Sequence, residues 1–96
     1  MSYNLNARVE REIIEFAKKY GVRKVILFGS RARGDNRERS DIDLAVSGGD
    51  IGEFREAVDE ETWTLLMFDV VNLDMGISAE LQAELDRDGV VLYEET

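Results

Sequence analysis

Apolar residues recur at helical spacing near the start of the chain and in short continuous runs further along. The helical pattern follows an asparagine that can cap a helix, either Asn4 or Asn6, and it stops at Gly21. Offsets of three and four residues place its apolar members on one side of a helix. These members are Val9, Ile13, Phe16, Ala17 and Tyr20.

The same pattern predicts two further helices and four strands. Asp50 caps a helix that runs to about Asp59, and Ser78 caps one that Gly89 ends. Runs rich in β-branched, aromatic and large apolar residues predict strands. These runs are 24–28, 41–46, 62–73 and 90–93. The order predicts an α/β (α+β) fold with a single β-sheet of about four strands flanked by helices.

The length and the missing residue types narrow the chemistry. A chain of 96 residues has the length of one domain, 1–96. Cysteine and histidine are absent, which excludes disulfides, thiolate metal sites and the usual zinc ligands. Any metal ion would be held by oxygen atoms, which favours magnesium, calcium or manganese. No apolar run is long enough to span a membrane and no secretory signal opens the chain, so we expect a cytoplasmic protein.

The charge is strongly negative but uneven. A net charge of −9 disfavours binding to DNA or RNA, because such binding depends on neutralising phosphates. Residues 31–39 nevertheless contain four arginines and only two acids. A basic loop on an acidic body indicates a small anionic ligand, or an acidic face that meets a basic protein partner.

Two aspartates interrupt the second predicted strand. Asp41 and Asp43 share one face of an extended strand, with their Cα atoms about 7 Å apart. At an effective dielectric constant of about 20, two such charges repel by about 2 kcal/mol. A divalent cation reverses the sign of this interaction, provided that a third carboxylate completes the site. The alternative is a solvated strand face, or a turn after Ser40.

A Gly-Ser pair directly follows the first predicted strand, with ten residues between Ser30 and Asp41. Gly29 lets the backbone turn sharply and approach a ligand closely. If a helical turn starts at Ser30, its free N–H groups and the hydroxyl group suit a phosphate oxygen. The pair alone predicts only a turn. Together with the two aspartates, it predicts a site for nucleotidyl transfer.

The stretch FGSRARGDNRERSDIDLAV, residues 28–46, resembles the signature of the nucleotidyltransferases of the DNA polymerase beta superfamily. Its GSRARG and SDIDLAV segments are similar to the minimal nucleotidyltransferase (MNT) branch, and the resemblance covers about residues 7–94. It implies a polymerase beta-like fold with a mixed sheet, two Mg²⁺ ions, and ATP as the nucleotide donor.

The resemblance also implies a third aspartate on a neighbouring strand. Asp69 is favoured, because it interrupts an apolar run and needs a partner or a metal ion there. Asp74, the other candidate, stands before a Met-Gly pair where a turn explains it, and a structural alternative for Asp69 is pairing with Arg31. The family mechanism implies that Asp41 and Asp43 bind both ions. Asp69 would bind the ion nearer the attacking hydroxyl group and accept its proton.

The nucleotide is expected to lie at the Gly-Ser turn. Gly29 and Ser30 would hold the triphosphate with their N–H groups and the serine hydroxyl group. Arg31 and Arg33 are predicted phosphate contacts, because a guanidinium group binds two oxygens at once, although exposed arginines also serve only solubility. The two later arginines of the loop are assigned to its surface.

The resemblance implies a protein acceptor. Minimal nucleotidyltransferases occur beside HEPN-type toxins, and transfer of AMP to a toxin tyrosine silences the toxin. The predicted partner is therefore a HEPN-type toxin, with this chain as its antitoxin. Two alternatives stay open: neutralisation by binding alone, and transfer to a small molecule such as an aminoglycoside. Leu92 and Tyr93, on a predicted edge strand, suggest a homo- or hetero-oligomeric contact.

Overall fold

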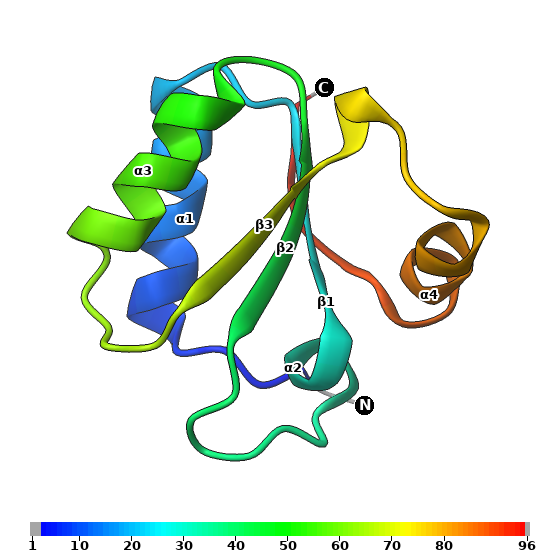
Figure 1. Ribbon diagram of the computed structural model, residues 1–96. Helices are drawn as coiled ribbons and strands as arrows, with labels where there is room; N and C mark the ends of the chain where they lie inside the picture. The colour runs from blue at the N-terminus through cyan, green and yellow to red at the C-terminus, as the bar shows by residue number, and fades with distance from the viewer. Residues whose placement is uncertain (1–2, 96) are drawn as a thin grey trace.

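Helices and strands alternate around one central sheet in the computed structural model, which describes residues 3–95 (Figure 1). The elements are α1 Ala7–Lys19, β1 Lys24–Phe28, α2 Gly29–Arg33, β2 Ile42–Ser47, α3 Ile51–Glu61, β3 Phe68–Asn72, the 3₁₀ helix η1 Leu73–Met75, α4 Ala79–Asp88 and β4 Val90–Glu94. No helix within the described range has both the length and the apolar character needed to cross a bilayer.

The sheet is mixed, with the strand order β3-β2-β1-β4. β1 pairs antiparallel with β2 and with β4, whereas β2 and β3 run parallel. A parallel pair needs a crossover connection, and α3 supplies it. β4 lies at one edge of the sheet, as predicted for the strand that carries Leu92 and Tyr93.

The two faces of the sheet are covered unequally. α1 and α3 lie side by side over one face, and α4 lies on the other (Figure 1). Leu27, Leu44 and Phe54 belong to the large core on the first face, and all three are fully buried. The core under α4 is small, with Leu85 as its contribution from the helix. α4 packs against β1 and α2, and on this face Ala45 of β2 is buried whereas Asp69 of β3 is exposed.

The predicted capping residues begin three helices. Asn6, rather than Asn4, caps α1, because its side-chain oxygen accepts hydrogen bonds from the N–H groups of the first turn. Asp50 caps α3 and Ser78 caps α4 in the same way. The backbone of Asn4 instead donates to the carbonyl oxygen of Arg31, which ties the start of the chain to α2.

The strand predicted for residues 62–73 is wrong at both ends. β3 begins only at Phe68, because residues 62–66 have no neighbouring strand to pair with, and the first ladder bond joins Ile42 N to Met67 O at 2.9 Å. The hydroxyl oxygen of Thr64 accepts from Leu66 N at 3.1 Å, a local bond that competes with strand pairing. After Asn72 the chain turns into η1.

Candidate functional site

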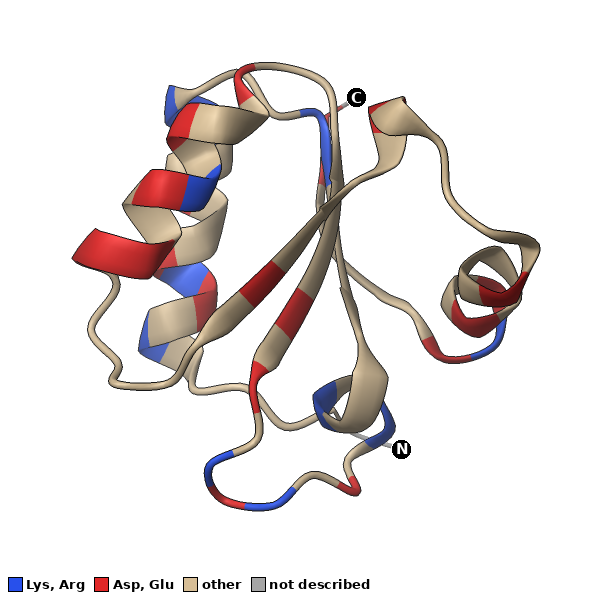
Figure 2. Cartoon of the chain, viewed as in Figure 1, with Lys and Arg blue, Asp and Glu red and all other residues tan. Residues whose placement is uncertain are grey.

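Two of the three predicted carboxylates are direct neighbours in the sheet. The parallel pairing sets Asp43 of β2 opposite Asp69 of β3. Leu44 and Val70 point into the core beneath α1 and α3, so the two aspartates occupy the other, open face. The acidic positions of the two strands lie side by side in Figure 2. Asp41 immediately precedes β2 and shares the side of Asp43 by alternation. The parallel register therefore brings the three carboxylates to one end of the sheet.

The electrostatic state of Asp43 reflects this crowding. The pKa of the Asp43 carboxyl is raised to about 6, most strongly by burial and then by the nearby charges of Asp69, Asp41 and Glu84, in that order. Arg33 acts in the opposite direction but does not cancel the effect. Arg33 thus does not neutralise all the negative charge of these carboxylates. Binding of a further cation at the site would therefore be electrostatically favourable.

Glu84 is a site residue that the sequence analysis missed. It lies on α4, half-buried, and its Oε2 atom is 3.8 Å from Nη1 of Arg33. The signal was present in the helical spacing, because Glu84 follows Leu81 by three residues and so faces the sheet with it.

Arg33 lies at the border of the site. Its Nε atom is 3.1 Å from Oδ2 of Asp35, and its other contact is Glu84 of α4. About a third of its side chain is exposed, so these ion pairs are weak and easily exchanged for another anion. The phosphate contact of Arg33 stays a prediction.

Arg31 does not fit its predicted function. Its side chain is only 6% exposed, and Nε, Nη1 and Nη2 donate to the carbonyl oxygens of Ser40 (3.0 Å), Asn4 (3.3 Å) and Glu38 (3.0 Å). Three N–H groups of the guanidinium group are thus already bonded to backbone carbonyl oxygens. No ion pair within residues 3–95 joins it to Asp69 either. Arg31 instead fastens the loop that leads into β2.

The predicted helical turn after the first strand is present as α2. Gly29 begins it with a φ of +75°, a left-handed value that favours glycine. A Cβ atom at Gly29 would collide with the carboxylate of Asp43. No side chain caps this helix, so its first N–H groups have no side-chain acceptor. The Gly-Ser turn and the acidic pair are therefore in direct contact.

This contact makes Gly29→Ala informative. A side chain at a left-handed φ lowers the free energy of unfolding by about 1–2 kcal/mol. The new methyl group also displaces the Asp43 carboxylate, whose pKa we expect to fall toward its ordinary value. Gly76→Ala is the matched control, because Gly76 has a φ of +86° and open space around it. Urea denaturation should show a loss for both variants. A carboxyl NMR titration in which the pKa of Asp43 stays unchanged in Gly29→Ala would contradict the contact.

Asp74 lies at the other end of the sheet. Its Oδ2 atom accepts a hydrogen bond of 2.8 Å from Gly48 N, and the side chain of Asn72 caps its own N–H group. Gly48 is five residues beyond Asp43 along extended chain, a separation of about 16 Å. Asp74 thus stabilises a turn, and Asp69 is the aspartate of this segment that lies beside Asp43.

The donor set suits a hard divalent cation, although the side chains are not closed around one position. Within residues 3–95, no three acidic side chains are grouped tightly enough to hold an ion as they stand. Neighbouring strands are about 4.8 Å apart, so rotation about the side-chain torsions of Asp43 and Asp69 brings both within reach of one ion.

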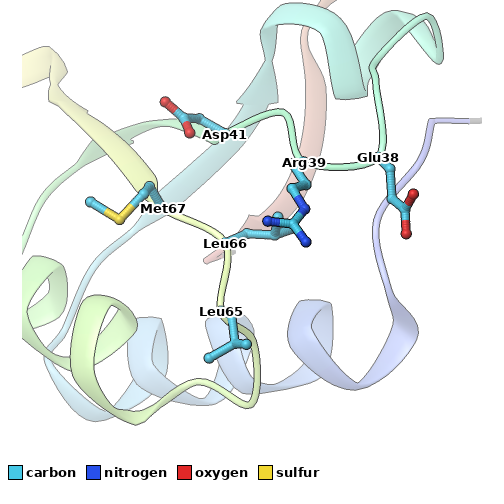
Figure 3. A pocket seen from close by; sticks show the side chains of 6 residues that line it. All are labelled: Glu38, Arg39, Asp41, Leu65, Leu66 and Met67. Atoms are coloured by element: carbon cyan, nitrogen blue, oxygen red, sulfur yellow. The ribbon is translucent and has the colours of Figure 1, made fainter.

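A cavity of about 440 Å³ opens beside Asp41 (Figure 3). The charged part of its wall comes from the loop before β2 and the apolar part from the segment before β3. The lining residues are Glu38, Arg39, Asp41, Leu65, Leu66 and Met67. Its volume is in the range of small-ligand sites and is large enough to admit a side chain of another molecule. Its lining is partly charged and partly apolar.

The described site consists of a Gly-Ser turn next to paired aspartates on adjacent strands. The family model for "Polymerase beta, Nucleotidyltransferase" matches residues 11–96, and the chain belongs to this family. The predicted family and the predicted fold are thereby confirmed.

Known proteins resemble the chain in sequence and in structure. Over 47 residues it is 43% identical to the "Putative protein adenylyltransferase MJ0435" of Methanocaldococcus jannaschii, covering 49% of this chain and 50% of that protein. The chain spans about half the length of the curated relatives it matches. A crystal structure of "the toxin-antitoxin with AMP-PNP" has a TM-score of 0.68 at 25% identity, covering 91% of this chain and 74% of that one. A mutant of the toxin-antitoxin MntA-HpeT has a TM-score of 0.71 at 26% identity, covering 97% and 76%.

Proposed function

We propose that this chain transfers a nucleoside monophosphate, AMP from ATP, to a hydroxyl group of a partner protein. The observation that carries the proposal is the pairing of Asp43 with Asp69 in contact with the start of α2, together with the raised pKa of Asp43. The family, the adenylyltransferase name of the relative and the AMP-PNP in the similar complex support the choice of reaction and donor.

Each group has a defined task in this proposal. Asp41, Asp43 and Asp69 hold Mg²⁺, most simply two ions, and the bound metal neutralises the carboxylates and acts as a Lewis acid on phosphate oxygens. The N–H groups at Gly29 and Ser30 hold the triphosphate, because they begin a helix without a side-chain cap.

The reaction exchanges one bond to the α-phosphorus for another. The acceptor oxygen bonds to the α-phosphorus atom, the bond from that atom to the bridging oxygen breaks, and pyrophosphate leaves. Asp69 accepts the proton of the acceptor hydroxyl group, because it is exposed and hence reachable from outside. Arg33 offsets negative charge on the phosphates.

The acceptor in this proposal is a tyrosine of a HEPN-type toxin, which the transfer silences. The resemblance to toxin-antitoxin structures supports this choice, and a net charge of −9 suits docking to a basic partner. A second candidate is a non-catalytic antitoxin that acts by complex formation, because the similar structures are complexes. Co-expression of the triple Asp41→Asn, Asp43→Asn, Asp69→Asn variant separates the two. Full neutralisation without transfer would favour the second.

Asp69→Asn tests the proposed function against a matched neighbour. It removes a proposed metal ligand, so we expect transfer of labelled AMP from ATP in Mg²⁺ to fall by at least about a hundredfold, which is more than the loss of an outer-shell group causes. Asp74→Asn removes the same charge five residues away and should stay within about twofold of the wild type, because Asp74 only accepts a bond from Gly48. The transfer is measured in solution with labelled ATP, where EDTA serves as a further control. The intact mass of the co-expressed partner gives a second measurement. Equal activities of the two variants would exclude Asp69 from the site.

A further inference from the structure

The segment between α3 and β3 exposes three large apolar side chains. Trp63 is 66% exposed, Leu65 102% and Met67 69%. They alternate with residues that face inward, since Leu66 and Phe68 pack against the main core. An outward apolar row of this kind is uncommon on a free surface and indicates an interaction site.

The segment is held in a defined shape. Trp63 N donates to Oε1 of Glu12 at 2.8 Å, and the guanidinium carbon of Arg8 lies 4.4 Å from the centre of the Trp63 ring. The hydroxyl group of Thr62 donates to the carbonyl oxygen of Val58 at the end of α3. Because these contacts fix the backbone before a partner arrives, binding loses less conformational entropy than it would with a mobile loop.

The apolar row leads directly to the acidic site. Met67 precedes Asp69 by two residues, and its carbonyl oxygen accepts the ladder bond from Ile42, the residue after Asp41. The cavity of Figure 3 spans this junction, with Leu65 and Met67 on one part of its wall and Asp41 on another. A molecule bound to Trp63, Leu65 and Met67 can therefore also contact the carboxylate of Asp41.

The charge of the chain favours one kind of occupant. A second copy would bring another net charge of −9 to this face, and the repulsion disfavours self-association. A basic protein gains from the same charges, and an apolar side chain of it fits the cavity. We propose, on the basis of the proposed transfer function, that Trp63, Leu65 and Met67 form the docking surface for the acceptor protein. The acceptor would present a basic patch and an apolar side chain beside its reactive hydroxyl group.

The single tryptophan of the chain reports on this docking. The probes are short synthetic tyrosine peptides without tryptophan: one with lysines and leucines around the tyrosine, one with serines in place of the leucines, and one with glutamates in place of the lysines. We expect the lysine-leucine peptide to shift the fluorescence of Trp63. The other two should bind at least about tenfold more weakly.

A double variant, Leu65→Ser with Met67→Ser, removes the apolar row beside the site. It should weaken binding of the lysine-leucine peptide by about tenfold or more, and raise the KM for AMP transfer to it while leaving the affinity for a fluorescent ATP analogue unchanged. Met75→Ser with Val91→Ser is the matched control, because Met75 and Val91 are also exposed apolar residues and lie outside the row. This control should bind and react as the wild type does.

The outcomes separate docking from catalysis. Equal peptide affinity of the double variant and the wild type, no fluorescence shift at all, or equal binding of the glutamate peptide would overturn the docking surface, whatever the activity. If the wild type and the control variant formed a concentration-dependent dimer and the Leu65→Ser, Met67→Ser variant did not, the docking surface would also be overturned. The row would then bind a second copy of the chain. Docking that depends on Leu65 and Met67, without any AMP transfer by the wild type, would support the surface and reject the proposed reaction.

Discussion

Replacing Asp43 by asparagine is expected to reduce AMP transfer by at least about a hundredfold and to stabilise the folded domain at pH 8. Asp43 is central to the site, because it is the register partner of Asp69 and lies two residues from Asp41. Loss of a direct metal ligand should have a larger effect than the loss of an outer-shell group, which already reduces activity by about ten- to a hundredfold. Labelled-ATP transfer over a range of Mg²⁺ concentrations measures it.

The gain in stability follows from the raised pKa of Asp43. The folded state binds this proton more tightly than the unfolded chain, whose pKa is near the ordinary 3.8. The free energy of unfolding therefore falls as the pH rises from about 4 to about 6, and stays at its lower level above that. Because Asp43 is half-buried and partly screened, we expect a loss of about 1–2 kcal/mol, which Asp43→Asn abolishes.

Asp59→Asn is the matched control for this pH dependence. Asp59 is an exposed acid on α3, so its substitution changes the net charge equally but leaves the site intact. Urea denaturation at pH 4 and pH 8 should show Asp43→Asn gaining on the wild type only at the higher pH, and Asp59→Asn following the wild type at both. An Asp43→Asn variant that is less stable than the wild type at pH 8 would contradict the electrostatic account.

Arg31→Met is expected to lower the free energy of unfolding by about 2–4 kcal/mol. It leaves the carbonyl oxygens of Asn4, Glu38 and Ser40 without their donor, and each unsatisfied buried acceptor costs about 1–3 kcal/mol, less where water can enter. For a domain of this size, the change corresponds to a fall in Tm of more than about 10 °C. Thermal and urea denaturation at pH 7 measure it.

Two further substitutions define what Arg31 does. Arg33→Met removes a partly exposed guanidinium group held only by surface ion pairs, and should change the free energy of unfolding by less than about 0.5 kcal/mol. Arg31→Lys keeps the charge but has one donor nitrogen instead of a fork, so it should recover little of the loss. Stability of Arg31→Met equal to that of Arg33→Met would show that the buried bonds contribute nothing.

The burial of Arg31 could not be predicted from the sequence motif. Four arginines follow the Gly-Ser turn, and nothing in their sequence distinguishes a buried donor to backbone carbonyls from a phosphate contact. The distinction depends on where the chain start and the loop before β2 come together, which are far apart in sequence. The helical spacing places Glu84 on the same face of α4 as Leu81, but its closeness to Arg33 arises only when α4 packs beside α2.

The third carboxylate is a question of register. Asp69 and Asp74 both follow apolar residues in one segment, and local pattern only favours the first. The parallel pairing of β2 and β3 sets Asp69 opposite Asp43. Asp74 lies beyond the end of β2, where it accepts a hydrogen bond from Gly48 N. Pairing partners also decide where a strand stops: residues 62–66 have strand-like composition but no neighbouring strand.

The sequence by itself determined the alternation of helices and strands, the caps at Asp50 and Ser78, the absence of histidine and cysteine as metal ligands, and the family. These properties follow from neighbouring residues, through backbone propensity, side-chain period and residue chemistry. Only the tertiary structure decided that Asp43 meets Asp69, that Arg31 is buried, and that an apolar row borders the acidic site. These depend on contacts between distant segments, because burial and electrostatic shifts exist only when the chain is folded.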